Sequence, residues 1–192
     1  AVFFDCDGVL NREIGGHGII CQDQVEVLEG AAEAVRLARQ SGMLTIAVTN
    51  RPQVAKGFLD RDGLDGVLGR LEAKLAEGKG VLDRIYFCPH HPEHGFPGEV
   101  KELKLNCDCR KPKPGMIQRA ARELPVDLSR SVMIGDSLRD IGAARAADIW
   151  AYGVQTGYGL KDRIPFQGSI PKPDMIFDHV LDAVRFQCSY TS

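Results

Sequence analysis

The sequence lacks any apolar run near the ~20 residues that a helix needs to cross a bilayer, so we expect no membrane partner. It also lacks an excess of charge of either sign, because 24 Lys and Arg residues stand against 26 Asp and Glu residues. A near-neutral chain offers no broad basic surface, so we expect no nucleic-acid partner. No basic segment leads into an apolar core, so no signal peptide is visible. Because the chain starts at Ala1 and not at a methionine, we expect further residues upstream.

Internal repeats and low-complexity segments are absent too, which favours an ordinary globular chain. The 192 residues, 44% of them hydrophobic, suit a single domain over residues 1–192 with a sizeable core. The six cysteines are unevenly spaced: Cys6, Cys21, Cys88, Cys107, Cys109 and Cys188. A secreted domain held by disulfides is usually shorter, and Cys107 and Cys109 could not easily reach separate disulfide partners. We therefore expect the reducing cytoplasm, with a metal site and three spare thiols.

Apolar segments of strand length alternate with amphipathic segments of helix length. The expected strands are residues 1–5, 43–50, 83–88, 131–136, 149–156 and 174–177. The expected helices are residues 29–40, 53–78 with a break near 63–66, 115–124 and 140–148. This alternation predicts an α/β fold, a Rossmann-like doubly wound and mostly parallel sheet with right-handed crossovers. Residues 157–173, which are rich in Pro and Gly, are expected to form a surface loop.

Polar side chains follow several of these strands at the point where each strand ends. Asp5 and Asp7 follow the first strand, and Gly8 lets the chain turn so that both carboxylates face one pocket. Thr49 and Asn50 end the second strand. Because ligands sit beyond the carboxyl ends of such a sheet, we expect these side chains to converge there.

The converging groups suit phosphoryl chemistry. Asp136, which ends the fourth strand, adds a third carboxylate, and three carboxylates repel one another unless a cation such as Mg²⁺ lies between them. A carboxylate can also act as a nucleophile, and a second carboxyl group as general acid and base. Arg110 and Lys111 could bind phosphate oxygens. A single Asp is more often a loop or capping residue, so it is the ordered set that favours a functional interpretation.

Four segments in order, FFDCDGVLN, AVTNR, CDCRKPKPGM and MIGDSLRDIGAARAAD, resemble the motifs of the haloacid dehalogenase superfamily of phosphatases. The resemblance implies that Asp5 is the nucleophile and that Asp7 is the general acid and base. It further implies that Thr49 holds the transferring phosphoryl group and that Lys111 offsets its charge. Mg²⁺ would be held by Asp5, Asp136 and the backbone carbonyl of Asp7, with Asp140 orienting these ligands.

The segments CPHHP and CDCRKPKPGM further resemble the zinc-loop branch of this superfamily, which lacks a large cap domain. The implied Zn²⁺ ligands are Cys88, His90, Cys107 and Cys109, in a loop over residues 88–109. Three thiolates and one imidazole make a closed tetrahedral set, which is typical of a structural site. His91 and His94 are rivals for the imidazole position, and we expect both to be solvated loop residues, with His94 near the substrate.

This branch is typified by heptose-bisphosphate phosphatases, so the resemblance implies a sugar-phosphate substrate and removal of the 7-phosphate in lipopolysaccharide synthesis. A histidinol-phosphate phosphatase and a zinc-stabilised module without catalysis are the alternatives. The chain departs from the branch pattern at Cys6, Arg51 and Ser137. We expect Asn50, Arg51 and Arg110 to bind substrate, with Arg51 on the second phosphate. A compact domain without a cap favours hydrolysis over phosphotransfer, and we expect a monomer.

Overall fold

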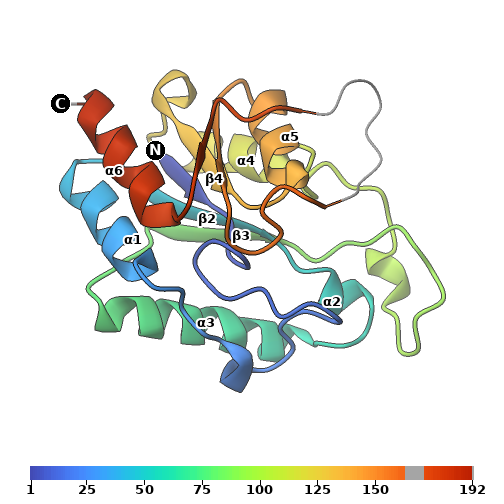
Figure 1. The fold of residues 1–192 in the computed structure, drawn as a ribbon. Helices are drawn as coiled ribbons and strands as arrows, with labels where there is room; N and C mark the ends of the chain where they lie inside the picture. Colours follow the sequence, from blue (N-terminus) through green and yellow to red (C-terminus); the bar gives the residue numbers. More distant parts are fainter. Residues whose placement is uncertain (163–170, 192) are drawn as a thin grey trace.

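The computed structural model describes residues 1–162 and 171–191, and a six-stranded sheet lies at its centre (Figure 1). The strand order is β3-β2-β1-β4-β5-β6, and every neighbouring pair is parallel. The strands are β1 Val2–Phe4, β2 Thr45–Asn50, β3 Arg84–Cys88, β4 Val132–Gly135, β5 Trp150–Val154 and β6 Met175–Phe177. The predicted α/β architecture is confirmed. Part of the predicted surface loop, residues 163–170, lies outside the described residues.

Helices cover both faces of this sheet (Figure 1). They are α1 Ala31–Gln40, α2 Pro52–Ala55, α3 Arg61–Glu77, α4 Gly115–Glu123, α5 Leu138–Ala146 and α6 Val180–Thr191. Short 3-10 turns are η1 Gln22–Gln24, η2 Lys101–Leu103 and η3 Leu128–Arg130. Side chains of α1, α3 and α6 pack in one apolar cluster with Val2 and Phe4, whereas α4 and α5 pack on the opposite side with Phe3. The alternation along β1 therefore sends neighbouring residues into two separate cores.

The central strand β1 is buried on both faces, as its sequence predicts. Val2, Phe3 and Phe4 are each fully buried. Burying a phenylalanine side chain stabilises the folded state by ~1.5–3 kcal/mol. Tight packing of β1 fixes the position of Asp5, the next residue, whose N–H donates to the carbonyl oxygen of Ile134 at 3.0 Å.

Two helices differ from the sequence predictions. The expected break near residues 63–66 is wrong, because α3 runs through both glycines without interruption. The ends of the Leu59 and Gln22 side chains pack closely over Gly63 and Gly66, where a Cβ would meet them. The chain instead breaks before Asp60, which caps the helix by accepting a hydrogen bond from the Gly63 N–H at 2.8 Å. Helix α6 was not predicted at all.

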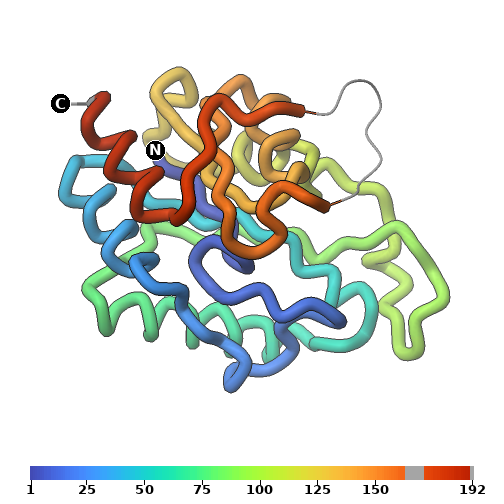
Figure 2. Tube along the Cα trace, viewed as in Figure 1, coloured from blue at the N-terminus to red at the C-terminus, as the bar shows by residue number. Residues whose placement is uncertain are grey.

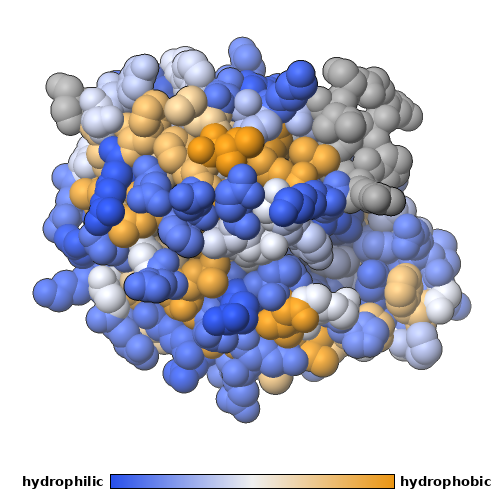
Figure 3. All heavy atoms as spheres, in the orientation of Figure 1, coloured by the Kyte–Doolittle hydropathy of each residue, from blue (hydrophilic) through white to orange (hydrophobic). Residues whose placement is uncertain are grey.

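A long irregular segment joins β3 to α4 and projects beyond the sheet (Figure 2). Hydrophilic residues dominate the face shown in Figure 3, and hydrophobic residues gather in its upper half. The edge strand β6 exposes Met175 and Ile176. None of the helices within residues 1–162 and 171–191 has the length and hydrophobicity that a membrane-spanning helix requires.

Candidate active site

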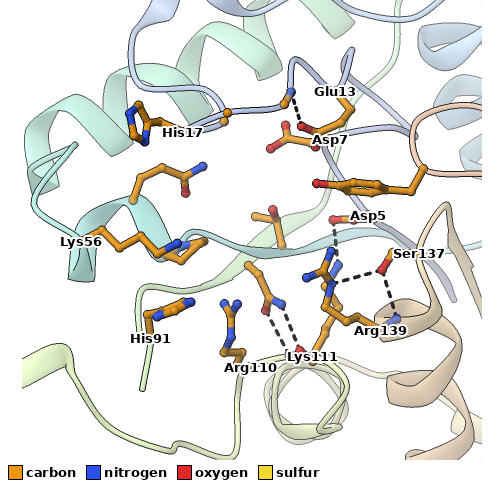
Figure 4. A pocket seen from close by; sticks show the side chains of 18 of the residues that line it. Asp5, Asp7, Glu13, His17, Lys56, His91, Arg110, Lys111, Ser137 and Arg139 are labelled. Atoms are coloured by element: carbon orange, nitrogen blue, oxygen red, sulfur yellow. Dashed lines mark hydrogen bonds and ion pairs between the residues drawn. The ribbon is translucent and has the colours of Figure 1, made fainter. Parts of the chain in front are cut away.

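A cavity of about 410 Å³ opens at the carboxyl ends of β1, β2 and β4. The strand order reverses at β1, and this is where open α/β sheets bind their ligands. Eight of the candidate residues line the cavity: Asp5, Asp7, Thr49, Asn50, Arg110, Lys111, Asp136 and Asp140. Arg51 is not among the lining residues. The structure thus brings together segments that lie far apart in the sequence (Figure 4).

Lys111 is the cation at the centre of the site. Its Nζ lies 2.8 Å from Asp5 Oδ1 and 2.6 Å from Asp140 Oδ1, and it donates to the Val48 carbonyl oxygen at 2.8 Å. Burial alone would lower the pKa of Lys111, but the two carboxylates outweigh it and raise that pKa. Lys111 therefore stays charged and holds one oxygen of Asp5 in place.

Three carboxylates meet around this lysine. Oxygens of Asp5, Asp136 and Asp140 lie within 4.8 Å of one another. Burial first, and then the charges of Asp140 and Asp5, raise the pKa of Asp136. One Asp136 oxygen, Oδ2, accepts from the Tyr158 N–H at 2.7 Å, while the buried Oδ1 has no partner among the described residues.

This carboxylate cluster fits a divalent cation. Hard carboxylate oxygens are the ligands that Mg²⁺ prefers, and its charge would relieve the repulsion that raises the Asp136 pKa. Gly8 has a φ of 87°, and a Cβ at this position would overlap the carboxylate of Asp136. Only glycine therefore lets the loop after β1 approach this carboxylate so closely.

Asp7 sits beside the cluster and is held by Arg51. Arg51 Nη1 donates to Asp7 Oδ2 at 2.8 Å, and Nη2 donates to Asp7 Oδ1 at 3.2 Å. The Arg51 side chain is only 1% exposed. The expectation that Arg51 contacts the second phosphate is therefore wrong in this structure, because its guanidinium is buried and paired with a carboxylate. Burial raises the pKa of Asp7, and the charge of Arg51 opposes that shift.

A second cluster joins the four residues that the sequence proposed as zinc ligands. Neighbouring ligand atoms of Cys88, His90, Cys107 and Cys109 lie 3.2 to 3.6 Å apart. A tetrahedron with Zn–S bonds of ~2.3 Å has edges of roughly 3.7 Å, so the four atoms could close around one ion. The sulfur atoms are too far apart for disulfides, whose S–S bond is ~2.05 Å. The donor set therefore fits a structural Zn²⁺ ion.

The cysteine cluster is tied to the cavity through the main chain. The Arg51 N–H donates to the Cys88 carbonyl oxygen at 2.7 Å. Asn50 bonds the main chain of Lys111, two residues after Cys109. Both side-chain ends of Asn50 are thus engaged by protein, which makes it a support for Lys111.

The far wall of the cavity combines His91, which the sequence offered as a rival zinc ligand, with residues that the sequence did not single out. Lys56 Nζ lies 4.6 Å from the centre of the Phe96 ring, and His91 packs edge-on against the same ring. His17 packs against Phe58 with ring centres 4.1 Å apart and the two rings tilted by 46°. Figure 4 places Lys56, His91 and Arg110 along one side, opposite Asp7 and Glu13.

The two rival histidines differ from expectation. His91 is 7% exposed and lines the cavity, so its prediction as a solvated residue is wrong. His94 is exposed and pairs with Glu99 at 3.1 Å, and it does not line the cavity. The sequence around His91 and His94 did not indicate which side chain lines the cavity, because that depends on how the whole segment folds.

Comparisons with known proteins agree with this architecture. The HAD-hydrolase-like family model matches residues 108–183. A D-glycero-beta-D-manno-heptose-1,7-bisphosphate 7-phosphatase of Haemophilus ducreyi is 36% identical over 190 residues, which cover 97% of each chain. The protein of the same name from Escherichia coli (strain K12) is 37% identical over 150 residues, covering 78% of this chain and 75% of that one. The crystal structure of D,D-heptose 1,7-bisphosphate phosphatase from B. bronchiseptica, complexed with magnesium and phosphate, is 30% identical, with a TM-score of 0.82 and 98% coverage of both chains.

Proposed function

Because the chain belongs to the haloacid dehalogenase-like hydrolases and is a phosphatase, we propose that it removes the 7-phosphate of D-glycero-β-D-manno-heptose 1,7-bisphosphate. The observation that carries the chemistry is the buried contact of Lys111 with both Asp5 and Asp140. The substrate rests on the names of the relatives and on the cations of the far wall.

In the first proposed step, Asp5 attacks phosphorus, a P–O bond to Asp5 forms and the bond to the sugar oxygen breaks. Asp5 Oδ1 already accepts from Lys111 Nζ and from the Cys6 N–H at 2.7 Å, so Oδ2 is the oxygen we assign to attack. Asp7 would donate its proton to the leaving sugar oxygen. A correctly placed general acid contributes roughly 10²–10⁴-fold to such a step.

In the second step, water attacks the phosphorus of the aspartyl phosphate and Asp7 takes the proton of that water. The P–O bond to Asp5 breaks, which releases phosphate and restores both carboxyl groups. Thr49 and Lys111 would hold the phosphoryl oxygens throughout. Positioning and charge stabilisation supply most of the catalysis in phosphoryl transfer, so these groups suffice.

The proposed Mg²⁺ ligands are Asp5, Asp136 and the backbone carbonyl of Asp7. When bound, Mg²⁺ would neutralise charge on the phosphoryl oxygens. Asp140 would serve indirectly, because its carboxylate holds Lys111 and its Oδ2 accepts from the Ser137 N–H at 3.0 Å. Zn²⁺ is the proposed occupant of the cysteine cluster, where it would fix the segment that ends in Arg110 and Lys111.

We assign the 1-phosphate of the substrate to Lys56, His91 and Arg110. All three line the cavity on the side away from Asp7 (Figure 4). Lys56 and Arg110 would repel the ammonium group of histidinol phosphate, which supports the bisphosphate over that alternative. Burial and the charges of these two residues lower the pKa of His91, so we assign it the role of a neutral hydrogen-bonding group.

A substrate panel tests the assignment. Purified protein with Mg²⁺ is expected to release one phosphate from heptose 1,7-bisphosphate and to turn over histidinol phosphate at least about 100-fold less efficiently, by the cost of unpaired buried charge. Phosphorus NMR of the product should show the 1-phosphate retained. Running both anomers side by side tests the β preference. Efficient turnover of histidinol phosphate with none of heptose bisphosphate would overturn the substrate while leaving the reaction class intact.

A further inference from the structure

The pair formed by Arg51 and Asp7 is unusual in its place and in its burial. Arg51 is the single residue between β2 and α2, and Asp7 lies in the loop after β1. The guanidinium is 1% exposed and lies behind the cavity, whereas the Asp7 carboxylate is 15% exposed and lines it. Arg51 therefore contacts the proposed general acid without reaching the space that a substrate would fill.

The geometry points to one role, and we infer that Arg51 is a positioning residue that orients the Asp7 carboxyl group toward the leaving oxygen of the substrate. This inference rests on the proposed reaction, in which Asp7 transfers the proton. Two parallel N–H donors at 2.8 and 3.2 Å fix the plane of the carboxylate as well as its place. An aspartate side chain would otherwise turn easily about its terminal torsion.

Arg51 is the main restraint on this carboxylate. Within residues 1–162 and 171–191, the other side-chain donor to it is Asn11 Nδ2, which lies 3.4 Å from Oδ1, at the limit of a hydrogen bond. Arg51 is in turn fixed from outside the cavity, because its N–H donates to the Cys88 carbonyl oxygen at 2.7 Å. The end of β3 thus sets the place of Arg51, and Arg51 sets the orientation of Asp7.

Stability alone does not account for this pair. Removing two charges from water costs several kcal/mol per ion, so a buried pair seldom stabilises a fold more than apolar side chains would. Arg51 Nε is also buried without a partner among the described residues, and an unsatisfied donor costs ~1–3 kcal/mol. Counting partners in the described part of the chain, the guanidinium is satisfied only on the edge that faces Asp7, which is the arrangement expected if Arg51 orients Asp7.

The test compares esters whose leaving groups differ in their need for a proton. We would measure kcat/KM of wild type, Arg51→Met and Arg51→Lys on p-nitrophenyl phosphate, phenyl phosphate and an alkyl phosphate, with Tm for each protein. Nitrophenolate leaves without a proton, so we expect kcat/KM of Arg51→Met for p-nitrophenyl phosphate to fall by less than about threefold. For the alkyl phosphate, whose leaving oxygen needs a proton from the general acid, kcat/KM of Arg51→Met should fall by about 100-fold. Arg51→Lys keeps the charge but cannot hold both oxygens, so its losses should follow the same order and be smaller.

Controls separate positioning from folding and from the proposed function. Arg39→Met removes an exposed ion pair with Asp83 remote from the cavity, and it should leave all three rates unchanged. In an Asp7→Asn background, adding Arg51→Met should change kcat/KM for phenyl phosphate by less than about twofold. Arg51 acts through the carboxyl group of Asp7, and that group is already absent from this background.

Three results would count against the account in different ways. The role of Arg51 would be overturned if Arg51→Met lowered kcat/KM equally for all three esters. It would also be overturned if Arg51→Met lowered kcat/KM as much in the Asp7→Asn background as it does in wild type. If Arg51→Met does not fold, Arg51→Lys decides by the same criterion. A wild type that cleaves the esters but rejects heptose bisphosphate would overturn only the substrate assignment, and one that cleaves no ester would overturn the reaction and the inference together.

Discussion

Asn50 binds the main chain of Lys111 from both ends of its amide. Asn50 Oδ1 accepts from the Lys111 N–H at 3.0 Å, and Asn50 Nδ2 donates to the Lys111 carbonyl oxygen at 3.1 Å. The pair links the end of β2 to the segment that follows the cysteine cluster. The lysine that contacts Asp5 thus takes its position from a neighbouring strand.

Replacing Asn50 tests this link. Asn50→Ala leaves two main-chain groups of Lys111 without partners, at a cost of ~1–3 kcal/mol for each that stays buried. We expect a lower Tm and a kcat that falls by roughly 10–100-fold, because a displaced Lys111 stabilises the transition state less. Asn50→Asp retains an acceptor for the N–H and should lose less stability. Unchanged kcat in Asn50→Ala would show that Lys111 needs no such support.

The carboxylate cluster predicts an unusual pH dependence of stability. The pKa of Asp136 is raised in the folded state above the ordinary 3.8, so the folded protein binds this proton more tightly than the unfolded chain does. Stability contributed by such a group is present below the unfolded pKa and is lost as pH rises through the folded pKa. Without Mg²⁺, Asp136→Asn should therefore be more stable than wild type at pH 8, by on the order of 1–3 kcal/mol, and the difference should shrink toward pH 4.

Adding Mg²⁺ should reverse that order. A cation bound only by the folded protein raises its Tm by mass action. Wild type should gain stability with added Mg²⁺, and Asp136→Asn should gain little. A scan of Tm against pH and Mg²⁺ concentration checks both points. A wild type whose Tm ignores Mg²⁺ would contradict the assignment of this cluster.

The cysteine cluster predicts that metal content, stability and activity fall together. Cys107→Ser or Cys109→Ser removes one of the donors, so bound zinc measured by mass spectrometry should drop toward zero. We expect Tm to fall by roughly 10 °C and kcat to fall with it, since the segment before Lys111 loses its anchor. Cys21→Ser, at an exposed cysteine outside the cluster, should match wild type. A variant that loses zinc yet keeps full turnover would contradict the anchoring role.

The far-wall cations predict a selective loss of affinity. Lys56→Ala or Arg110→Ala should each raise KM for heptose 1,7-bisphosphate about tenfold, the usual scale for a charged hydrogen bond. KM for p-nitrophenyl phosphate, which has no second phosphate, should stay near that of wild type. Arg70→Ala, at an exposed position on α3, is the matched control. Equal effects on both substrates would show that these cations do not read the second phosphate.

Much of the fold was predictable because buried strands and strand-end carboxylates are local sequence features. AVFFD predicts a buried strand followed by an acid, and the structure places Asp5 directly after β1. Helix α6 was missed although Val180, Ala183 and Val184 show the i, i+3, i+4 spacing of a helix and are buried. Gly63 and Gly66 suggest a break, but the structure accommodates both inside α3, beneath the ends of the Leu59 and Gln22 side chains.

The site was less predictable where it depends on partners from distant segments. The motifs named Asp5, Asp7 and Lys111 from their order along the chain. They could not show that Arg51 stays out of the cavity, because this follows from its buried ion pair with Asp7, which comes from a distant segment. The contact between the His17 and Phe58 rings likewise joins two segments that only the folded chain brings together.

The central claim is that Asp5 becomes phosphorylated during turnover. The direct measurement is peptide mass spectrometry of protein quenched in acid during steady-state turnover of p-nitrophenyl phosphate with Mg²⁺. We predict one phosphoryl group on the peptide that contains Asp5, a larger phosphorylated fraction in Asp7→Asn, where the second step lacks its base, and none in Asp5→Asn. A phosphoryl group on any other residue, or full turnover by Asp5→Asn, would contradict the account.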